Sequence, residues 1–289
     1  MKKYSFIFFL LLAAFNVFSQ NSKESTPVFS AYEDTLKGFG KIILKGKSEE
    51  ERYNANREFS ALLEKALNEE SSYFYPFDSL VTIARLNAPD NSFKIFNWHV
   101  PKDDGTFEYF GFIQTNFKKN AVVYPLIDKS ADIESPELKT LEPSKWYGAH
   151  YYQIIFQKKR GNKYYTLLGW DGNDRLTNKK IIDVIYFPGK GAPKFGANIF
   201  SMEKKSPRRI IFEYAKEASM SLKFHEAKKQ IVFDHLSPSQ SHLAGQYQYY
   251  GPDLSFDALE FKKGKWEYIK DIDARNSNGS KNKMFNIPQ

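Results

Sequence analysis

A short loop, Asp171-Gly172-Asn173-Asp174, is the most oxygen-rich stretch of the chain. Asp171, Asn173 and Asp174 offer carboxylate and amide oxygens, the ligands that calcium prefers, but a full site needs about six to eight of them. The glycine and terminal glutamate of an EF-hand loop are missing, and Arg175 follows directly. A turn that needs the freedom of Gly172 explains the same residues. Calcium is therefore one interpretation of this loop, a plain turn is the other, and no other cofactor is expected.

Four aromatic residues lie close to this loop in the sequence: Trp146, Tyr147, Tyr151 and Trp170. Tyr151 and Trp170 are the outer ends of a predicted hairpin that folds at Gly161-Asn162, so antiparallel pairing brings them to the same open end. Exposed rings with polar tips can stack on a sugar or grip a peptide. Phe, Tyr and Trp make up 17% of the chain, and aromatic pairs also stabilise β cores. A recognition surface and a packed core both remain open.

Catalytic motifs occur only as near misses. The chain contains no G-x-S-x-G elbow. His225-Glu226 begins like a zinc-protease motif, but Lys229 stands where the second histidine is required. Gly191 to Gly196 has the spacing of a phosphate loop, but Ala197-Asn198 replaces the required Lys and Ser or Thr. No two of the five histidines have a metal-ligand spacing, so a hydrolase would need a site assembled from distant loops.

Pairs of lysines recur at the tips of predicted hairpins: Lys118-Lys119, Lys158-Lys159, Lys228-Lys229 and Lys262-Lys263. Gathered at one end of the fold, they would form a cationic surface for anionic polymers or lipid headgroups. The alternative is that they are solvated turns that discourage aggregation between strand edges.

The sequence predicts one long helix, over Ser48 to Glu70. Ser48 and Glu51 form a capping box, and acidic residues crowd the N-terminal end. The apolar residues recur at a spacing of three and four, as one buried stripe requires: Phe59, Leu62, Leu63, Ala66 and Leu67. We expect this stripe to pack on the rest of the fold.

After Pro76 the pattern changes to short aromatic and β-branched runs separated by brief polar turns, which is typical of strands. The predicted strands are Phe93 to Val100, Phe107 to Asn116, Ala121 to Asp128, Tyr151 to Gln157, Tyr164 to Trp170, Ser221 to Glu226, Ile231 to His235, Phe256 to Phe261 and Trp266 to Lys270. Their links contain Gly, Asn or Asp, so neighbours should be antiparallel. Residues 130–143 and 188–196 are predicted long loops, and a break near 130–145 would divide the β region into two subdomains.

The N-terminal end predicts export. Lys2 and Lys3 precede a run from Tyr4 to Phe15 that is apolar except for Ser5. Val17 and Ser19 are small enough for signal peptidase, so residues 1–19 are a predicted signal peptide. The run is shorter than the about 20 residues of a transmembrane helix. Residues 20–47 form an N-terminal segment, 48–274 the helix and β domain, and 275–289 a loose polar tail.

Composition narrows the function classes. Cysteine is absent, which excludes disulfides, thiolate catalysis and cysteine-ligated zinc. A net charge of +8 over 289 residues is too small and too dispersed to indicate a nucleic-acid-binding protein. The chain that follows the predicted signal peptide is long enough to fill a β core without disulfides.

Three segments together resemble uncharacterised exported proteins of Bacteroidetes-type bacteria. They are the Ser19-Gln20 junction after an aromatic-rich leader, Leu168 to Asn173, and Phe261 to Trp266. The resemblance extends over much of the chain after residue 19. It implies export and a Gram-negative envelope, with the periplasm as first choice and the extracellular space as second, and it implies no site residues.

We therefore expect a mainly β fold: an antiparallel meander, as a barrel, sandwich or twisted sheet, with one N-terminal amphipathic helix. The expected function is a non-catalytic envelope module that binds a glycan, a peptide or a protein partner. A hydrolase with a loop-assembled site and a structural envelope protein are the alternatives. Neither nucleic acid nor a transmembrane segment is expected.

Overall fold

The computed structural model describes residues 25–273, apart from 118–120 and 204–205. The predicted signal peptide and C-terminal tail therefore lie outside the described residues. The chain divides into two compact units. The first comprises residues up to Asp103 and Glu108–Ile127, and the second comprises Asp104–Phe107 and the chain from Asp128 onwards.

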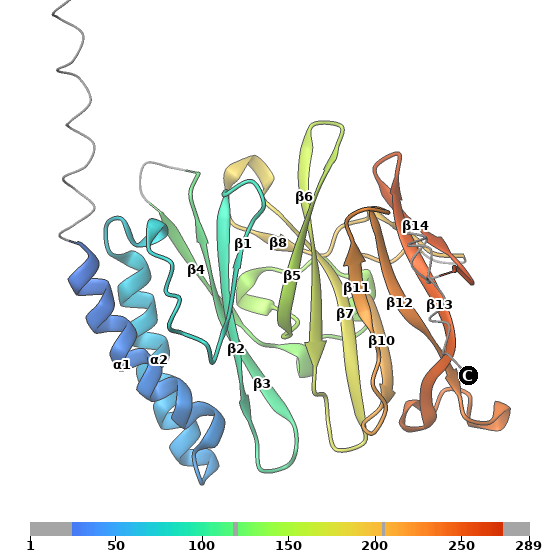
Figure 1. Cartoon of the computed structure of the whole chain (residues 1–289), viewed down its shortest axis with the longest axis horizontal. Coiled ribbons are helices and arrows are strands. Elements are labelled where there is room, and N and C mark those ends of the chain that lie inside the picture. The colour runs from blue at the N-terminus through green and yellow to red at the C-terminus, as the bar shows by residue number, and fades with distance from the viewer. Residues whose placement is uncertain (1–24, 118–120, 204–205, 274–289) are drawn as a thin grey trace, which may run out of the picture. The chain divides into compact units, whose positions relative to one another are not determined.

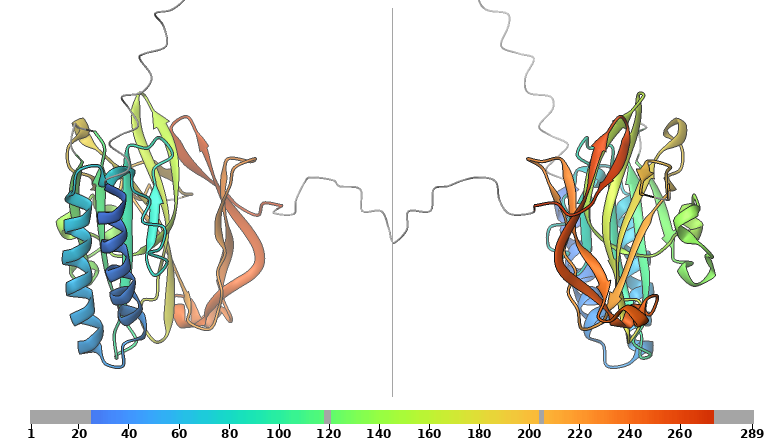
Figure 2. Two further views of the ribbon diagram at one scale, coloured as in Figure 1. Left: turned by 60° about the vertical axis from the view of Figure 1, so that its left-hand side comes forward. Right: turned by 90° about the vertical axis from the view of Figure 1, so that its right-hand side faces the viewer.

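The first unit is a four-stranded antiparallel sheet with two helices on one face (Figures 1 and 2). The sheet order is β1-β2-β3-β4, a plain meander. The elements are α1 (Ser25–Lys45), α2 (Glu49–Asn68), β1 (Ala84–Asn87), β2 (Phe93–Pro101), β3 (Phe107–Thr115) and β4 (Val122–Ile127), with a 3-10 turn η1 (Ser72–Phe74) after α2. Among the described residues, no helix is long and apolar enough to span a membrane.

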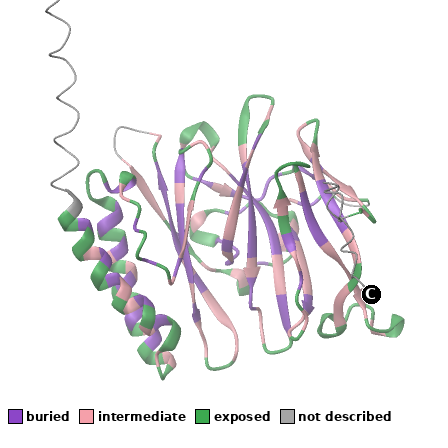
Figure 3. Ribbon diagram, viewed as in Figure 1, coloured by how far each residue is buried: buried purple, intermediate pink, exposed green. Residues whose placement is uncertain are grey.

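The expectation of a single helix is wrong, because residues 25–45 form a second one, α1. Its buried stripe is Phe29, Glu33, Leu36, Gly40 and Ile43, at a spacing of four and three (Figure 3). Phe29, Tyr32, Leu36, Phe39 and Ile43 follow the same spacing of three and four, so the helical period is present in the sequence and the prediction overlooked it. Glu33 is buried because its carboxylate accepts hydrogen bonds from Ser79 N at 2.6 Å and the Tyr75 hydroxyl at 2.9 Å. Gly40 has to be small because a Cβ there would lie 2.2 Å from Thr82 Oγ1.

Helix α2 begins as the sequence predicts, with Ser48 as its N-cap. Ser48 Oγ accepts a hydrogen bond from Glu51 N at 3.1 Å, and the Glu51 carboxylate reaches back to Lys47 N at 2.7 Å. The predicted apolar stripe is confirmed: Phe59, Leu63, Ala66 and Leu67 are buried and Leu62 is partly buried.

Ser48→Ala is expected to lower the free energy of unfolding of the first unit by about 1 kcal/mol, because it leaves a helix N–H without its acceptor. The matched control is Ser60→Ala in the middle of α2, where the Ser60 hydroxyl is buried without a hydrogen-bond partner. Chemical denaturation followed by circular dichroism compares the two. Equal losses would contradict the capping role.

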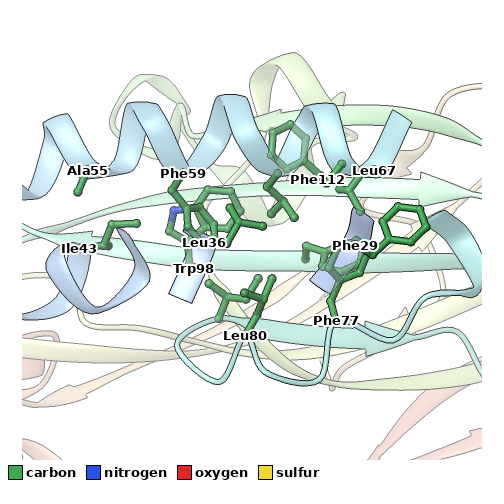
Figure 4. Close-up of a cluster of buried hydrophobic side chains, with 14 of the residues drawn as sticks. Phe29, Leu36, Ile43, Ala55, Phe59, Leu67, Phe77, Leu80, Trp98 and Phe112 are labelled. Atoms are coloured by element: carbon green, nitrogen blue, oxygen red, sulfur yellow. The ribbon is translucent and has the colours of Figure 1, made fainter. Parts of the chain in front are cut away.

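The core of the first unit lies between the helices and the sheet (Figure 4). Trp98 on β2 is its largest member: its ring packs edge-on against Phe59 at 4.9 Å, and its Nε1 donates to Asn56 Oδ1 at 2.6 Å. Phe112 on β3 and Leu36 on α1 complete this layer. Burial of apolar side chains from both helices fixes them on the sheet.

The second unit contains two further sheets. One has the order β10-β7-β6-β5 with β8 also paired to β7, and the other has the order β11-β12-β13-β14-β9. The strands are β5 (His150–Lys159), β6 (Asn162–Asp171), β7 (Thr177–Tyr186), β8 (Lys194–Phe195), β9 (Phe200–Ser201), β10 (Ile210–Ala215), β11 (Leu222–His225), β12 (Gln230–Pro238), β13 (Tyr250–Lys262) and β14 (Lys265–Ile269). Short 3-10 turns link them: η2 (Ser130–Asp132), η3 (Pro136–Leu138), η4 (Pro143–Lys145), η5 (Pro188–Lys190), η6 (Ser241–Leu243) and η7 (Tyr247–Tyr249).

These two sheets face each other across a common core (Figure 2). Phe212 of β10 and Phe233 of β12 meet at 4.7 Å between ring centroids. Trp266 of β14 is buried and donates from Nε1 to Thr166 Oγ1 of β6 at 2.9 Å. The Tyr152 hydroxyl of β5 also donates to the Leu222 carbonyl of β11 at 2.9 Å. Aromatic side chains and hydrogen bonds therefore hold the two sheets together.

The mainly β, antiparallel prediction is confirmed. Within the described ranges every sheet order has two ends, so no sheet closes into a barrel. All nine predicted strands are present. One pair departs from the antiparallel prediction: β14 and β9 are parallel. The prediction lacks β1, β7, β8, β9 and β10. The runs of β7 and β10 are interrupted by Lys, Asn, Asp and Glu.

Candidate functional site

The predicted aromatic surface is largely buried. Trp146, Tyr147 and Tyr151 are buried, and Trp170 is partly buried. The pairing that motivated the prediction does occur, since His150 lies opposite Trp170 and Tyr151 opposite Gly169. A buried ring cannot stack on a ligand, so three of these four rings offer no recognition face in this structure.

The buried rings instead surround an ion pair inside the second unit. Asp183 and Arg209 have no exposed side-chain surface, and Arg209 Nε donates to Asp183 Oδ2 at 2.8 Å. The Tyr151 hydroxyl lies 3.4 Å from the same oxygen, and Trp146 Nε1 donates to Tyr151 at 3.1 Å. Burial and the Asp183 charge raise the pKa of Tyr151 well above its usual value. The aromatic cluster is therefore a neutral shell around a buried charge pair.

The oxygens of the Asp171 to Asp174 loop are used by the loop itself. Asp171 Oδ1 accepts from Asn173 N at 2.8 Å, and Asp174 Oδ1 accepts from the backbone N–H groups of Leu176 and Thr177. These two backbone donors lower the pKa of Asp174, against the opposing effect of burial. Lys179 Nζ donates to Asn173 Oδ1 at 2.6 Å.

The Lys179 ammonium therefore already supplies a positive charge at this loop. The hydrogen bonds from the Asp171 and Asp174 carboxylates to backbone N–H groups are those of a closed turn. Across the described residues, no group of three or more His, Asp or Glu side chains is arranged to hold a metal ion. The proposed calcium ligands Asp171, Asn173 and Asp174 act in this structure as turn residues.

A groove of about 940 Å³ lies elsewhere in the second unit. Strand β10 contributes one wall, strands β12, β13 and β14 contribute the other, and residues around η3 and Met202 complete it. Its apolar lining includes Leu138, Met202, Ile211, Phe212, Phe233 and Leu236. A volume of this size is in the range of sites that hold small ligands or peptide side chains.

A hydrogen-bonded network in this groove centres on Asp257 of β13 and includes His235 of β12. His235 Nδ1 lies 2.7 Å from Asp257 Oδ2, and the Tyr268 hydroxyl of β14 donates to the same oxygen at 2.7 Å. The other Asp257 oxygen accepts from Asp271 N at 3.1 Å. Asp257 is 3% exposed and His235 31% exposed, so a buried carboxylate orients a ring that the solvent reaches.

A β-bulge creates the space for His235. The register of β12 and β13 pairs Asp234 with Phe256 and then Leu236 with Pro252, so His235 faces the three residues 253–255. Asp253 Oδ1 accepts from the backbone N and the hydroxyl of Ser255, and its Oδ2 lies 4.0 Å from His235 Nε2. Bulges commonly redirect side chains beside functional sites.

Leu254, at the top of this bulge, has a backbone φ of 73° and is 91% exposed. A leucine rarely adopts this left-handed conformation, which costs about 1–2 kcal/mol.

Leu254→Gly is expected to stabilise the second unit by up to about 1 kcal/mol, because glycine adopts a positive φ freely and no buried surface is lost. Lys223→Gly, at an exposed position of regular strand β11, is the control and should destabilise by about 0.5–1 kcal/mol. Thermal unfolding of both variants measures the difference. If Leu254→Gly loses as much stability as Lys223→Gly, the backbone at residue 254 is not strained.

The groove carries excess negative charge. Four carboxylates line it, Glu137, Glu203, Asp234 and Asp257, and its one arginine is Arg209, already paired with Asp183. Burial raises the pKa of the Tyr268 hydroxyl above its usual value. The hydrogen bond to Asp257 and the negative charges of Asp257, Glu203 and Asp271 raise this pKa further. The carboxylates therefore favour a positively charged occupant.

Sequence reasoning missed this site. Its residues come from three strands, and the bulge that exposes His235 is a property of strand pairing. One signal was available: the hairpin turning at Gly264 pairs Leu259 with Tyr268, which puts Asp257 and Tyr268 in diagonal positions of one sheet face. His235 lies on β12, the strand that pairs with β13 on its other side.

No protein-family model, no curated protein and no solved structure matches this chain.

Proposed function

We propose that this protein is a non-catalytic binding module of the cell envelope, and that its groove holds a peptide segment with a basic side chain. One observation carries the proposal: the groove combines apolar walls with four carboxylates. A peptide, unlike a glycan, supplies both matching groups, an aliphatic or aromatic side chain and a Lys or Arg. A neutral glycan offers no cationic group to the exposed Glu203 carboxylate.

A peptide array tests the ligand class. Short peptides that contain Lys or Arg beside apolar residues should bind the full chain more strongly than matched peptides with Glu in place of the basic residue. Glu203→Lys, which reverses one exposed charge of the groove, should weaken binding about tenfold, the equivalent of 1.4 kcal/mol. Equal binding of the Lys and Glu peptides would contradict the proposal.

The chain offers a matched control for the apolar wall. Leu138 lines the groove and is 63% exposed, whereas Leu176 is 59% exposed and lies in the β6–β7 turn outside it. Leu138→Ser should reduce peptide binding and Leu176→Ser should leave it unchanged, while both variants keep the wild-type melting temperature. If both variants bind like the wild type, the peptide does not occupy this groove.

A hydrolase is the second candidate, favoured by the contact between His235 and Asp257. A carboxylate on Nδ1 of a histidine is the base-and-orienter half of a catalytic triad, and such a histidine can activate water or a hydroxyl. The test is turnover of an activated ester by the full chain. Activity lost in His235→Gln but kept in His242→Gln, an exposed histidine outside the groove, would support a hydrolase. If the full chain does not hydrolyse the ester, the hydrolase candidate is contradicted and the binding module remains the proposal.

We further propose that the protein works outside the cytoplasm, in the periplasm or beyond the cell. The support is the pattern of residues 1–19: a basic start, an apolar run and small residues before Gln20. Mass spectrometry of the intact protein from envelope fractions should show a chain that begins at Gln20. A mass that retains residues 1–19 would contradict cleavage.

A further inference from the structure

Three hairpin tips of the second unit, outside the proposed peptide groove, concentrate positive charge. They are residues 158–163 between β5 and β6, 226–229 between β11 and β12, and 260–265 between β13 and β14. Together they carry nine basic and two acidic side chains, an excess close to the +8 of the whole chain. The basic residues are Lys158, Lys159, Arg160, Lys163, Lys228, Lys229, Lys262, Lys263 and Lys265. The fourth predicted lysine tip, Lys118-Lys119, lies outside the described residues.

The three tips gather at one end of this unit, as Figure 1 shows. Strand pairing places two of them together, because Gln230, at the end of the 226–229 turn, lies opposite Glu260. The third approaches from the other sheet: a Cβ added to Gly264 would lie 2.6 Å from Lys159 Cγ. Lysines that are separated by a hundred residues in the sequence therefore share one surface.

The tips are short and well defined. In the β5–β6 turn Arg160 and Gly161 both have positive φ, of 48° and 82°, and in the β13–β14 turn Lys263 and Gly264 have 49° and 80°. Two central residues with positive φ are the mark of type I′ turns, the tightest connection between antiparallel strands. The charges therefore lie on protruding tips that need no ordering before they bind.

These features favour a planar anionic partner over a polymer. None of the three tips contributes to the described groove of 940 Å³, whereas a polymer chain binds best in a groove. Within the described tip residues no large hydrophobic side chain is strongly exposed, so they offer neither stacking faces for sugars or bases nor a wedge for insertion. Eight of the nine basic residues are lysines, which act as point charges and respond to a diffuse field instead of a bidentate site.

We propose that the three tips form a docking surface for a phospholipid bilayer with anionic headgroups. Each lysine ammonium is attracted by the negative surface potential, which decays within a Debye length of about 10 Å at 0.1 M salt. Because the three tips lie at one end of the unit, several ammonium groups can approach the same surface. The attraction is electrostatic, so binding is peripheral and reversed by salt.

The full chain is tested by co-sedimentation with vesicles of phosphatidylcholine mixed with phosphatidylglycerol, against vesicles of phosphatidylcholine alone. Binding is expected only to the anionic vesicles, and raising the salt to 1 M should abolish it. The triple variant Lys158→Gln, Lys228→Gln and Lys263→Gln, one residue per tip, should bind at least about tenfold more weakly.

The matched control removes the same charge elsewhere in the second unit: Lys129→Gln, Lys139→Gln and Lys145→Gln, all exposed. It should bind anionic vesicles like the wild type. Equal loss in both triple variants would show a response to net charge alone and would overturn the docking surface. Binding to soluble polyglutamate without binding to anionic vesicles would also overturn it, in favour of a polymer. Peptide binding in the groove should be unchanged in either triple variant, so this proposal and the proposed function fail independently.

Discussion

Arg209→Ala is expected to lower the free energy of unfolding of the second unit by about 3–5 kcal/mol. The guanidinium is fully buried, donates to Asp183 at 2.8 Å and to the Pro136 carbonyl at 2.5 Å, and lies 5.7 Å from the Tyr147 ring centre. Burial alone would lower the pKa of Arg209, but the Asp183 charge and hydrogen bond outweigh it and raise the pKa. Removing the arginine leaves the Asp183 carboxylate buried without its counter-charge, which is far more costly than losing a surface ion pair.

Urea denaturation followed by tryptophan fluorescence measures this loss. Arg208→Ala, at the partly buried neighbouring position, is the control and should change the free energy of unfolding by no more than about 0.5 kcal/mol. The double variant Arg209→Met with Asp183→Leu should be more stable than Arg209→Ala alone, because it removes both charges. If Arg209→Ala and Arg208→Ala cost the same, the buried pair does not stabilise the fold.

Trp266→Ala is expected to destabilise the second unit by about 3–5 kcal/mol through the cavity it leaves between the sheets. The ring is fully buried, and it contacts Phe261 at 5.2 Å and Phe224 at 6.4 Å between centroids. Its Nε1 makes the hydrogen bond to Thr166 that joins β14 to β6. One substitution therefore removes aromatic contacts within the β11-β12-β13-β14-β9 sheet and a hydrogen bond between the two sheets.

Two further variants separate these contributions. Thr166→Val keeps the packing but removes the acceptor of the indole N–H, so a smaller loss of about 1–3 kcal/mol is expected. Tyr249→Ala, at a residue that is 44% exposed, should have a much smaller effect. Thermal unfolding ranks the three, and a Trp266→Ala loss no larger than that of Tyr249→Ala would contradict the role of the indole.

Local signals in the sequence determined much of the secondary structure. The capping residues at Ser48 and Glu51 and the stripe from Phe59 to Leu67 define α2, because side-chain to backbone bonds and helical spacing act within a few residues. Turn residues such as Gly161 and Gly264 define hairpins in the same way, since their backbone conformation is decided locally. Helix α1 carries the same kind of local signal, since Phe29, Leu36 and Ile43 recur at helical spacing, although the prediction overlooked it. The burial of Glu33 and Gly40 on this helix is not local, because it depends on Tyr75, Ser79 and Thr82.

Only the tertiary structure decided which side chains are exposed and which meet. The sequence correctly placed Tyr151 and Trp170 at one end of a hairpin, but burial of Tyr151 and Trp146 depends on Asp183 and Arg209, which other strands supply. The groove around His235 depends on a bulge between β12 and β13, and the lysine surface depends on how three hairpins pack. The physical reason is that strand formation is governed by neighbours along the chain, whereas burial, ion pairing and surface charge are governed by neighbours in space.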